Sequence, residues 1–284
     1  MSHHKADRKQ YSLFSLEETV EESINFIKEH EPEEGYLVAF SGGKDSIVTL
    51  ELVRMSGVKH KSAFSCTGLD PPEVVKFIRA EYPDTIFCKP KKSFWDSLVI
   101  KSPPTINFRW CCWSLKEYPP QTLGYTHVIT GVRSEESLAR SNSERIIYNK
   151  PKKKKQIRYD AIKYWTLWHV WEFIEENNLK YPSLYDEGFE RIGCVVCPYI
   201  CSSNMAKINL HRERWPKFYD KFEEVINKWW YSDKPRKGDR LKYSSPEEFL
   251  FYYYRNFYVN QADEILLNEL KAKRSSGEER EENK

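Results

Sequence analysis

The residues best suited to chemistry lie in the short stretch Ser41–Ser46 (SGGKDS), which follows an apolar run from Tyr36 to Phe40. Helical spacing of apolar residues begins directly after it, so the stretch is predicted to join a buried parallel strand to a helix N-terminus. The glycines Gly42 and Gly43 let the backbone turn sharply, and the N–H groups then face one concavity together with the positive end of the helix dipole. Such a concavity is expected to bind phosphate.

The side chains of this stretch add charge and hydroxyl groups. Lys44 is expected to neutralise phosphate charge, while the hydroxyls of Ser41 and Ser46 either bind phosphate oxygens or cap the helix. Asp45 is expected to hold Mg²⁺ or to act as a cap. The spacing is not that of a Walker loop, which places four residues between its first glycine and Gly-Lys. The stretch resembles the PP-loop of ATP pyrophosphatases, which split ATP between its α and β phosphates to adenylate a substrate.

Five of the seven cysteines fall into two groups, a Cys-Cys pair and a Cys-x-x-Cys-x-x-x-Cys run that begins 82 residues after the pair. The members are Cys111, Cys112, Cys194, Cys197 and Cys201. A Cys-x-x-Cys turn brings two thiolates to one metal, and four thiolates suit either zinc or a [4Fe–4S] cluster. Cys66 and Cys88 are expected to be small buried side chains.

The cysteine pattern resembles that of the assimilatory adenylylsulfate reductases in the PAPS (phosphoadenosine phosphosulfate) reductase family. The stretch Thr130–Arg140 (TGVRSEESLAR) resembles the part of that family that contacts the nucleotide and its anionic group. The resemblance implies that Gly131, Arg133 and Arg140 bind ATP phosphates or a substrate anion, with Arg133 catalytic beside Lys44 and Asp45. The alternative is that both arginines form salt bridges with Glu135 and Glu136.

Further segments carry the same resemblance. They are Tyr164–Trp171, with its Trp-Thr helix, and Tyr181–Phe189. Cys66 stands where the family usually has an aspartate before Thr-Gly.

Two departures from the reductases bear on function. Those enzymes use a catalytic cysteine near the C-terminus, whereas no cysteine follows Cys201 in this sequence. They also carry a degraded first loop, whereas SGGKDS has the form found where ATP itself is split. Both departures point away from sulfate reduction. The additional Cys201 and the intact loop instead resemble the iron–sulfur ATP pyrophosphatases of DNA phosphorothioation systems. That resemblance implies a [4Fe–4S] cluster on Cys112, Cys194 and Cys197, with Cys201 or alternatively Cys111 as the fourth ligand.

The predicted function is therefore an ATP pyrophosphatase that uses ATP and Mg²⁺ to adenylate a nucleic-acid oxygen for sulfur insertion. DNA is favoured over tRNA as the substrate, and a cysteine desulfurase or another sulfur donor is the expected partner. One alternative is an adenylylsulfate or PAPS reductase whose catalytic thiol comes from elsewhere. A second is a nucleic-acid-binding subunit with a structural metal site.

The basic run Lys152, Lys153, Lys154 and Lys155 is interpreted either as a contact to a nucleic-acid backbone or as a solvated loop. Overall charge gives no such signal, because 45 basic residues nearly balance 42 acidic ones. No apolar stretch reaches the ~18–20 residues that a membrane span needs. The first residues do not resemble a signal peptide, and a cytoplasmic location is expected.

Strand patterns at 36–40, 58–65, 85–88 and 127–130 alternate with helical patterns, which predicts an α/β fold with a parallel sheet flanked by helices. The PP-loop resemblance makes this sheet one of the adenine nucleotide alpha hydrolase type, with its ligands at the carboxyl ends of the strands. A helix is expected from Leu16, with Ser15 and Glu18 as a capping box, and another over 166–177. Asp70 is expected to cap a third helix after the second strand.

The predicted organisation has four parts. An N-terminal helical arm covers 1–34, the PP-loop domain with its iron–sulfur site covers 35–201, a helical C-terminal region covers 202–270, and a disordered tail covers 271–284. Helices over 213–230 and 249–266 are interpreted either as the face of a homodimer or as an ordinary core.

Overall fold

The computed structural model describes residues 14–148, 156–199, 205–233, 242–255 and 261–276. The chain forms two compact units, each made from two separate segments. Unit 1 consists of residues 1–91 and 114–193, and unit 2 of residues 92–113 and 194–284. Residues 92–113 thus belong with the C-terminal part of the chain, although they lie inside the span that the sequence assigns to the PP-loop domain.

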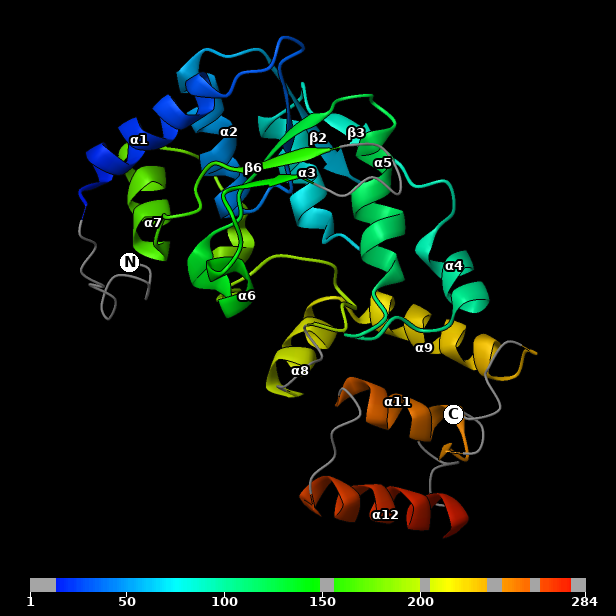
Figure 1. The fold of residues 1–284 in the computed structure, drawn as a ribbon. Coiled ribbons are helices and arrows are strands. Elements are labelled where there is room, and N and C mark those ends of the chain that lie inside the picture. The colour runs from blue at the N-terminus through cyan, green and yellow to red at the C-terminus, as the bar shows by residue number, and fades with distance from the viewer. Residues whose placement is uncertain (1–13, 149–155, 200–204, 234–241, 256–260, 277–284) are drawn as a thin grey trace. The chain divides into compact units, whose positions relative to one another are not determined.

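Unit 1 is built on a six-stranded sheet with the strand order β3-β2-β1-β4-β6-β5 (Figure 1). The strands are β1 (Tyr36–Ala39), β2 (His60–Ser65), β3 (Ile86–Cys88), β4 (His127–Thr130), β5 (Ile146–Tyr148) and β6 (Ile157–Asp160). All neighbours are parallel except β5, which runs antiparallel to β6. The predicted α/β fold with a parallel sheet is therefore confirmed. Chain order reverses between β1 and β4, and this is where ligands bind in open α/β sheets.

The short strands β5 and β6 were not predicted. They flank the lysine-rich stretch that the sequence analysis interprets as an exposed connection, and they have only three and four residues. Segments of this length give too little alternation for a strand to be recognised from the sequence.

Helices α1 (Leu16–Glu29), α2 (Lys44–Ser56) and α7 (Leu167–Glu176) pack against one another beside the sheet (Figure 1). The predicted capping box of Ser15 and Glu18 is present. Ser23 of α1 is fully buried and accepts a hydrogen bond from the indole N–H of Trp165 (2.9 Å). Helix α1 is thus an integral part of unit 1 and does not form a separate arm.

The remaining helices of unit 1 are α3 (Pro72–Glu81), α5 (Tyr118–Gln121) and α6 (Leu138–Ser141). The prediction that Asp70 caps α3 is wrong, because Pro71 is the N-cap and no side chain accepts a hydrogen bond there. The Asp70 carboxylate instead accepts the backbone N–H of Thr67 (2.7 Å) and so fixes the turn after β2.

Unit 2 is helical and contains α4 (Phe94–Lys101), α8 (Met205–Arg214), α9 (Pro216–Trp230), α11 (Pro246–Tyr254) and α12 (Gln261–Ser276). Its core is aromatic, with Phe94 stacked on Trp110 (ring centroids 5.6 Å apart) and Phe222 packed on Tyr253 (5.4 Å). The apolar faces of α9 and α11 thus pack on each other, which is the ordinary-core interpretation of these helices.

Helix α12 continues to Ser276, so the disordered tail predicted from residue 271 is wrong over 271–276. Lys271 pairs there with Glu248 of α11 (2.7 Å). Residues 277–284 lie outside the described part of the chain.

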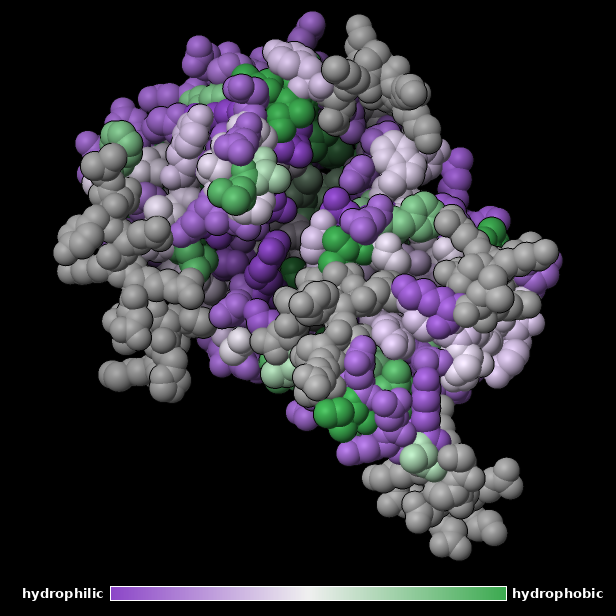
Figure 2. Space-filling view, turned by 60° about the horizontal axis from the view of Figure 1, so that its bottom comes forward, coloured by the Kyte–Doolittle hydropathy of each residue, from purple (hydrophilic) through white to green (hydrophobic). Residues whose placement is uncertain are grey.

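The coloured atoms on the face shown in Figure 2 are mainly hydrophilic, and apolar residues form separate small groups among them. Among the helices that the structure describes, none is both long and apolar enough to cross a membrane.

Candidate phosphate-binding site

The stretch Ser41–Ser46 forms the turn between β1 and α2, as the sequence predicts. Gly42 has a φ of +72°, and a Cβ at this position would lie 2.7 Å from the Ile78 side chain, so both the backbone conformation and the close packing on α3 require glycine. Gly43 is the N-cap of α2, and it has no side chain with which to cap the helix. The alternative in which a serine or Asp45 is the cap is therefore wrong.

The serine hydroxyls instead fix the shape of the turn. Ser46 Oγ donates to the carbonyl of Gly43 (2.8 Å) and accepts the backbone N–H of Ser41 (3.2 Å). The two hydroxyls also contact each other at 3.1 Å. This closed turn directs the N-terminus of α2 at the carboxyl end of β1.

A cavity of about 190 Å³ lies at this turn. Its lining includes the predicted residues Ser41, Gly43, Lys44, Asp45, Ser46, Gly131 and Arg140, together with Glu136, Tyr185 and Arg191, which were not predicted. A larger and more open hollow along α1 has four glutamates in its lining and would repel an anion, although its volume is about 460 Å³. The cavity at the turn is therefore the candidate site for a phosphate ligand.

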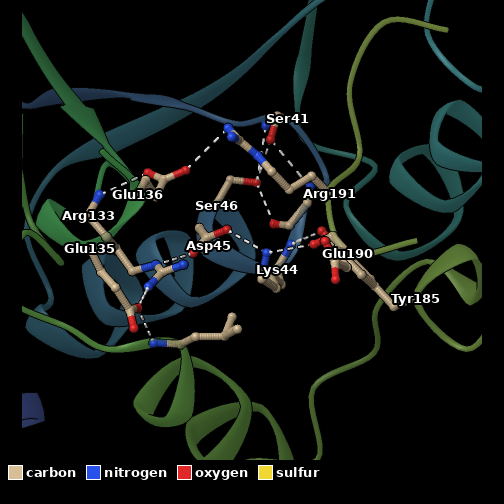
Figure 3. A network of polar contacts seen from close by, with 12 residues as sticks. Ser41, Lys44, Asp45, Ser46, Arg133, Glu135, Glu136, Tyr185, Glu190 and Arg191 are labelled. Carbon is tan, nitrogen blue, oxygen red and sulfur yellow. Dashed lines mark hydrogen bonds and ion pairs between the residues drawn. The ribbon is translucent and has the colours of Figure 1, made fainter. Parts of the chain in front are cut away.

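Asp45 lies between two cations at this site (Figure 3). Its carboxylate accepts Arg133 Nε at 2.6 Å and lies 3.2 Å from Lys44 Nζ. Burial alone would raise the pKa of Asp45, but the charges of Lys44 and Arg133 outweigh it and hold the pKa below its usual value. Asp45 is therefore ionised at neutral pH, with each of its oxygens close to a cation.

Arg133 is almost fully buried, and its guanidinium also bonds Glu135 at 2.5 Å. Burial opposes its charge, but the carboxylates of Asp45 and Glu135 raise the pKa of Arg133 above its usual value. Arg133 is not among the residues that line the cavity. Its ion pair with Asp45 ties the segment that follows β4 to the start of α2.

Glu136 joins the two arginines that line the cavity. It forms an ion pair with Arg140 and a second one with Arg191 at 3.4 Å. The side chain of Arg191 is 71% exposed and that of Arg140 is 37% exposed, so both guanidinium groups can reach a ligand. The salt bridges that the sequence left as an alternative are thus present, and they hold cationic groups at the cavity.

Gly131 has a packing role that the sequence analysis did not anticipate. A Cβ at this position would lie 2.8 Å from the carbonyl oxygen of Asp45 and 2.8 Å from Thr49 Oγ1. The end of β4 can therefore approach the first turn of α2 only because residue 131 has no side chain.

The thiols of unit 2 form a second feature. Cys112 begins the π-helical segment η2 (Cys112–Glu117), and Cys111 precedes it directly. A hydrogen bond with Cys112, burial, and the charges of Cys112, Cys194 and Cys197 all raise the pKa of Cys111. The Cys-Cys pair and the Cys-x-x-Cys run thus lie close enough to interact electrostatically.

This grouping is not a ready metal site. In the part of the chain that the structure describes, no three His, Cys, Asp or Glu side chains are arranged to hold a metal ion. Cys201 lies outside the described residues, as do the four lysines Lys152, Lys153, Lys154 and Lys155. Cys88 is buried as expected, and Cys66 is partly exposed.

Tyr185 and Arg191 come from the chain that follows α7, about 140 positions after the turn that they help to enclose. The only signal for Tyr185 in the sequence is the family resemblance of Tyr181–Phe189, which gave this residue no role. Arg191 lies outside that stretch and had no signal.

Comparisons with known proteins agree with this architecture. Residues 35–200 match the model of the phosphoadenosine phosphosulfate reductase domain. The protein MJ0066 of Methanocaldococcus jannaschii is 31% identical over 233 residues, which are 76% of this chain and 46% of that protein. An adenosine 5'-phosphosulfate reductase of Bacillus subtilis is 26% identical over 173 residues, which are 56% of this chain and 71% of that enzyme.

A crystal structure of Candida glabrata FMN adenylyltransferase with FMN and an ATP analogue superposes with a TM-score of 0.51 at 13% identity, over 67% of this chain and 66% of that one. This likeness concerns the fold alone. The chain spans about half the length of its two Methanocaldococcus jannaschii relatives (46% and 48%).

Proposed function

Because the chain belongs to the phosphoadenosine phosphosulfate reductase family, we propose that its intact SGGKDS turn binds ATP and that unit 1 splits ATP between the α and β phosphates. One observation carries the proposal: the turn lies at the N-terminus of α2, beside a cavity whose lining also holds Lys44, Arg140 and Arg191. Helix N–H groups and guanidinium groups are the donors that phosphate oxygens prefer.

In this proposal, the backbone N–H groups and serine hydroxyls of the turn bind the pyrophosphate that leaves. Lys44 neutralises the charge that develops on it, and Arg140 and Arg191 bind phosphate oxygens. Each oxygen of Asp45 already has one cationic contact, so a Mg²⁺ ion held by Asp45 would compete with Lys44 and Arg133 for this carboxylate.

The test is release of pyrophosphate from ATP by the Lys44→Ala variant. We expect a loss of about 100-fold or more, since removal of one group that stabilises transition-state charge has this size of effect. Lys76→Ala, which changes an exposed lysine on α3, is the control and should keep normal turnover. Normal pyrophosphate release by the Lys44→Ala variant would remove the turn from the mechanism.

The proposed acceptor of the adenylyl group is a nucleic-acid oxygen, DNA before tRNA, with sulfur supplied by a cysteine desulfurase. The intact turn and the thiol grouping support adenylation followed by sulfur insertion over a function limited to ATP binding. Pyrophosphate release should rise when DNA is added together with the sulfur donor, and ³⁵S should appear in the DNA. Incorporation into tRNA instead would assign the other acceptor.

We further propose that the thiols of unit 2 hold a [4Fe–4S] cluster. The donor type and the mutual influence of Cys111, Cys112, Cys194 and Cys197 support it. Anaerobically purified protein should contain about four irons and four acid-labile sulfides per chain. Cys194→Ser should lose them and Cys66→Ser should not. One zinc without sulfide would instead indicate a structural site.

A second candidate function is sulfonucleotide reduction, which the similarity to the Bacillus subtilis adenosine 5'-phosphosulfate reductase favours. Release of sulfite from adenosine 5'-phosphosulfate in the presence of thioredoxin, without pyrophosphate release from ATP, would select this function.

A further inference from the structure

The segment Tyr185–Arg191 makes three polar contacts at the candidate phosphate site (Figure 3). The Tyr185 hydroxyl accepts the backbone N–H of Lys44 at 3.0 Å. The carbonyl of Glu190 accepts Lys44 Nζ at 3.3 Å. Arg191 pairs with Glu136 at 3.4 Å. One short segment thus engages both the backbone and the side chain of Lys44.

The hydroxyl occupies the place of a helix cap. Gly43 has no side chain to accept the first N–H groups of α2, so the N–H of Lys44 needs an acceptor from elsewhere. The Tyr185 hydroxyl also lies 3.2 Å from where a Cβ on Gly43 would be, which places it directly over the turn. The phenol therefore uses a donor that an anion at this helix N-terminus would use.

Both partners are shielded from water, with 4% of Lys44 and 3% of Tyr185 exposed. Burial raises the pKa of Tyr185, so its hydroxyl is a neutral acceptor at physiological pH. A charged phosphate oxygen forms a hydrogen bond about twice as strong as a neutral acceptor does. A phosphate can therefore replace the phenol at the Lys44 N–H, but breaking the hydrogen bond to the phenol reduces the net binding free energy of the phosphate.

We propose that Tyr185 is a positioning residue that holds the phosphate-binding turn in shape when no nucleotide is bound, and that phosphate binding displaces its hydroxyl from the N–H of Lys44. The inference rests on the proposed function, because it takes phosphate as the ligand of the turn.

The first test is calorimetric binding of inorganic pyrophosphate with Mg²⁺, and of an ATP analogue with a methylene bridge between the α and β phosphates. Tyr185→Phe keeps the ring but removes the competing hydroxyl. Its Kd should fall about 3- to 10-fold, which corresponds to one net hydrogen bond. The control is Tyr181→Phe, which removes a hydroxyl bonded to Asp186 (3.1 Å) in the same part of the chain and should leave Kd unchanged.

Hydrogen exchange of the unaltered protein gives a second test that needs no variant. Pyrophosphate should speed exchange in peptides covering 185–188, next to the displaced hydroxyl, while it slows exchange at the start of α2. An unchanged or raised Kd in Tyr185→Phe, or slower exchange over 185–188, would overturn the inference while pyrophosphate binding still supports the proposed function. If neither the unaltered protein nor Tyr185→Phe binds pyrophosphate, the proposed phosphate site itself is wrong and the inference falls with it.

Discussion

At the level of single residues, Asp45 has two roles. It orients the guanidinium of Arg133, and it is the ion-pair partner of the buried ammonium of Lys44. The structure holds both cations within 3.2 Å of one carboxylate. Removing one member of a buried charge group leaves its partners without compensation, which costs much more than losing an exposed ion pair. The stability of the turn should therefore depend on Asp45 even without ATP.

We predict that Asp45→Asn lowers the free energy of unfolding at pH 7 by about 3 kcal/mol, from the loss of a buried partner. The pKa of Asp45 lies below its unfolded value, so its stabilising contribution is fully present above about pH 4 and is lost as the pH falls through the folded pKa. Urea unfolding between pH 7 and pH 3 measures this. The gap between the two proteins should stay constant down to about pH 4 and then shrink.

The exposed pair of Arg54 and Glu51 (3.4 Å) offers the matched comparison. Glu51→Gln should change the free energy of unfolding by less than about 1 kcal/mol. An equally small effect of Asp45→Asn would mean that Lys44 and Arg133 find other partners.

At the same scale, the sequence predicts those site residues that lie next to one another in the chain. Ser41–Ser46 could be recognised because its six adjacent residues together match one phosphate-binding pattern. Tyr185 and Arg191 could not, because their contacts to Lys44 and Glu136 depend on how the chain returns to the sheet after α7. The ion pair of Arg133 with Asp45 spans 88 positions and escaped prediction for the same reason.

At the scale of elements, the approach of β4 to α2 builds the site. Gly131 allows it, because any Cβ there would meet the Asp45 carbonyl and Thr49 at 2.8 Å. The sequence predicts β4 and α2 separately from their patterns, but it does not indicate how closely they pack. From the sequence, Gly131 is predicted only to bind ATP phosphates, whereas the structure also gives this glycine a packing role.

Gly131→Ala should therefore destabilise the fold by about 2–3 kcal/mol through overpacking and should shift the first turn of α2. Thermal unfolding and pyrophosphate release measure the two effects. Gly193→Ala is the comparison, because a Cβ at residue 193 meets nothing within 4 Å, and its stability should change by less than about 0.5 kcal/mol. Equal stability of both variants would mean that α2 moves aside freely.

At the scale of the whole molecule, each unit is assembled from segments far apart in the sequence. Residues 92–113 join unit 2 through α4, whose Phe94 stacks on Trp110 and lies near Phe222 of α9 (ring centroids 6.4 Å apart). Tyr253 of α11 also donates to the carbonyl of Pro104 (2.7 Å). The sequence predicts the helices over 213–230 and 249–266 but not α4, and amphipathic patterns do not indicate which helices share a core.

This arrangement makes a prediction about cooperative units. Phe222→Ala removes a fully buried ring, which should cost about 3–4 kcal/mol. Hydrogen exchange should then quicken in both α4 and α9, although more than 100 positions separate them, while β1 in unit 1 keeps its protection. Phe173→Ala, in the core of unit 1, should instead quicken exchange in β1 while α4 and α9 keep their protection. Equal loss of protection in β1 and α9 in either variant would show that the two units unfold as one.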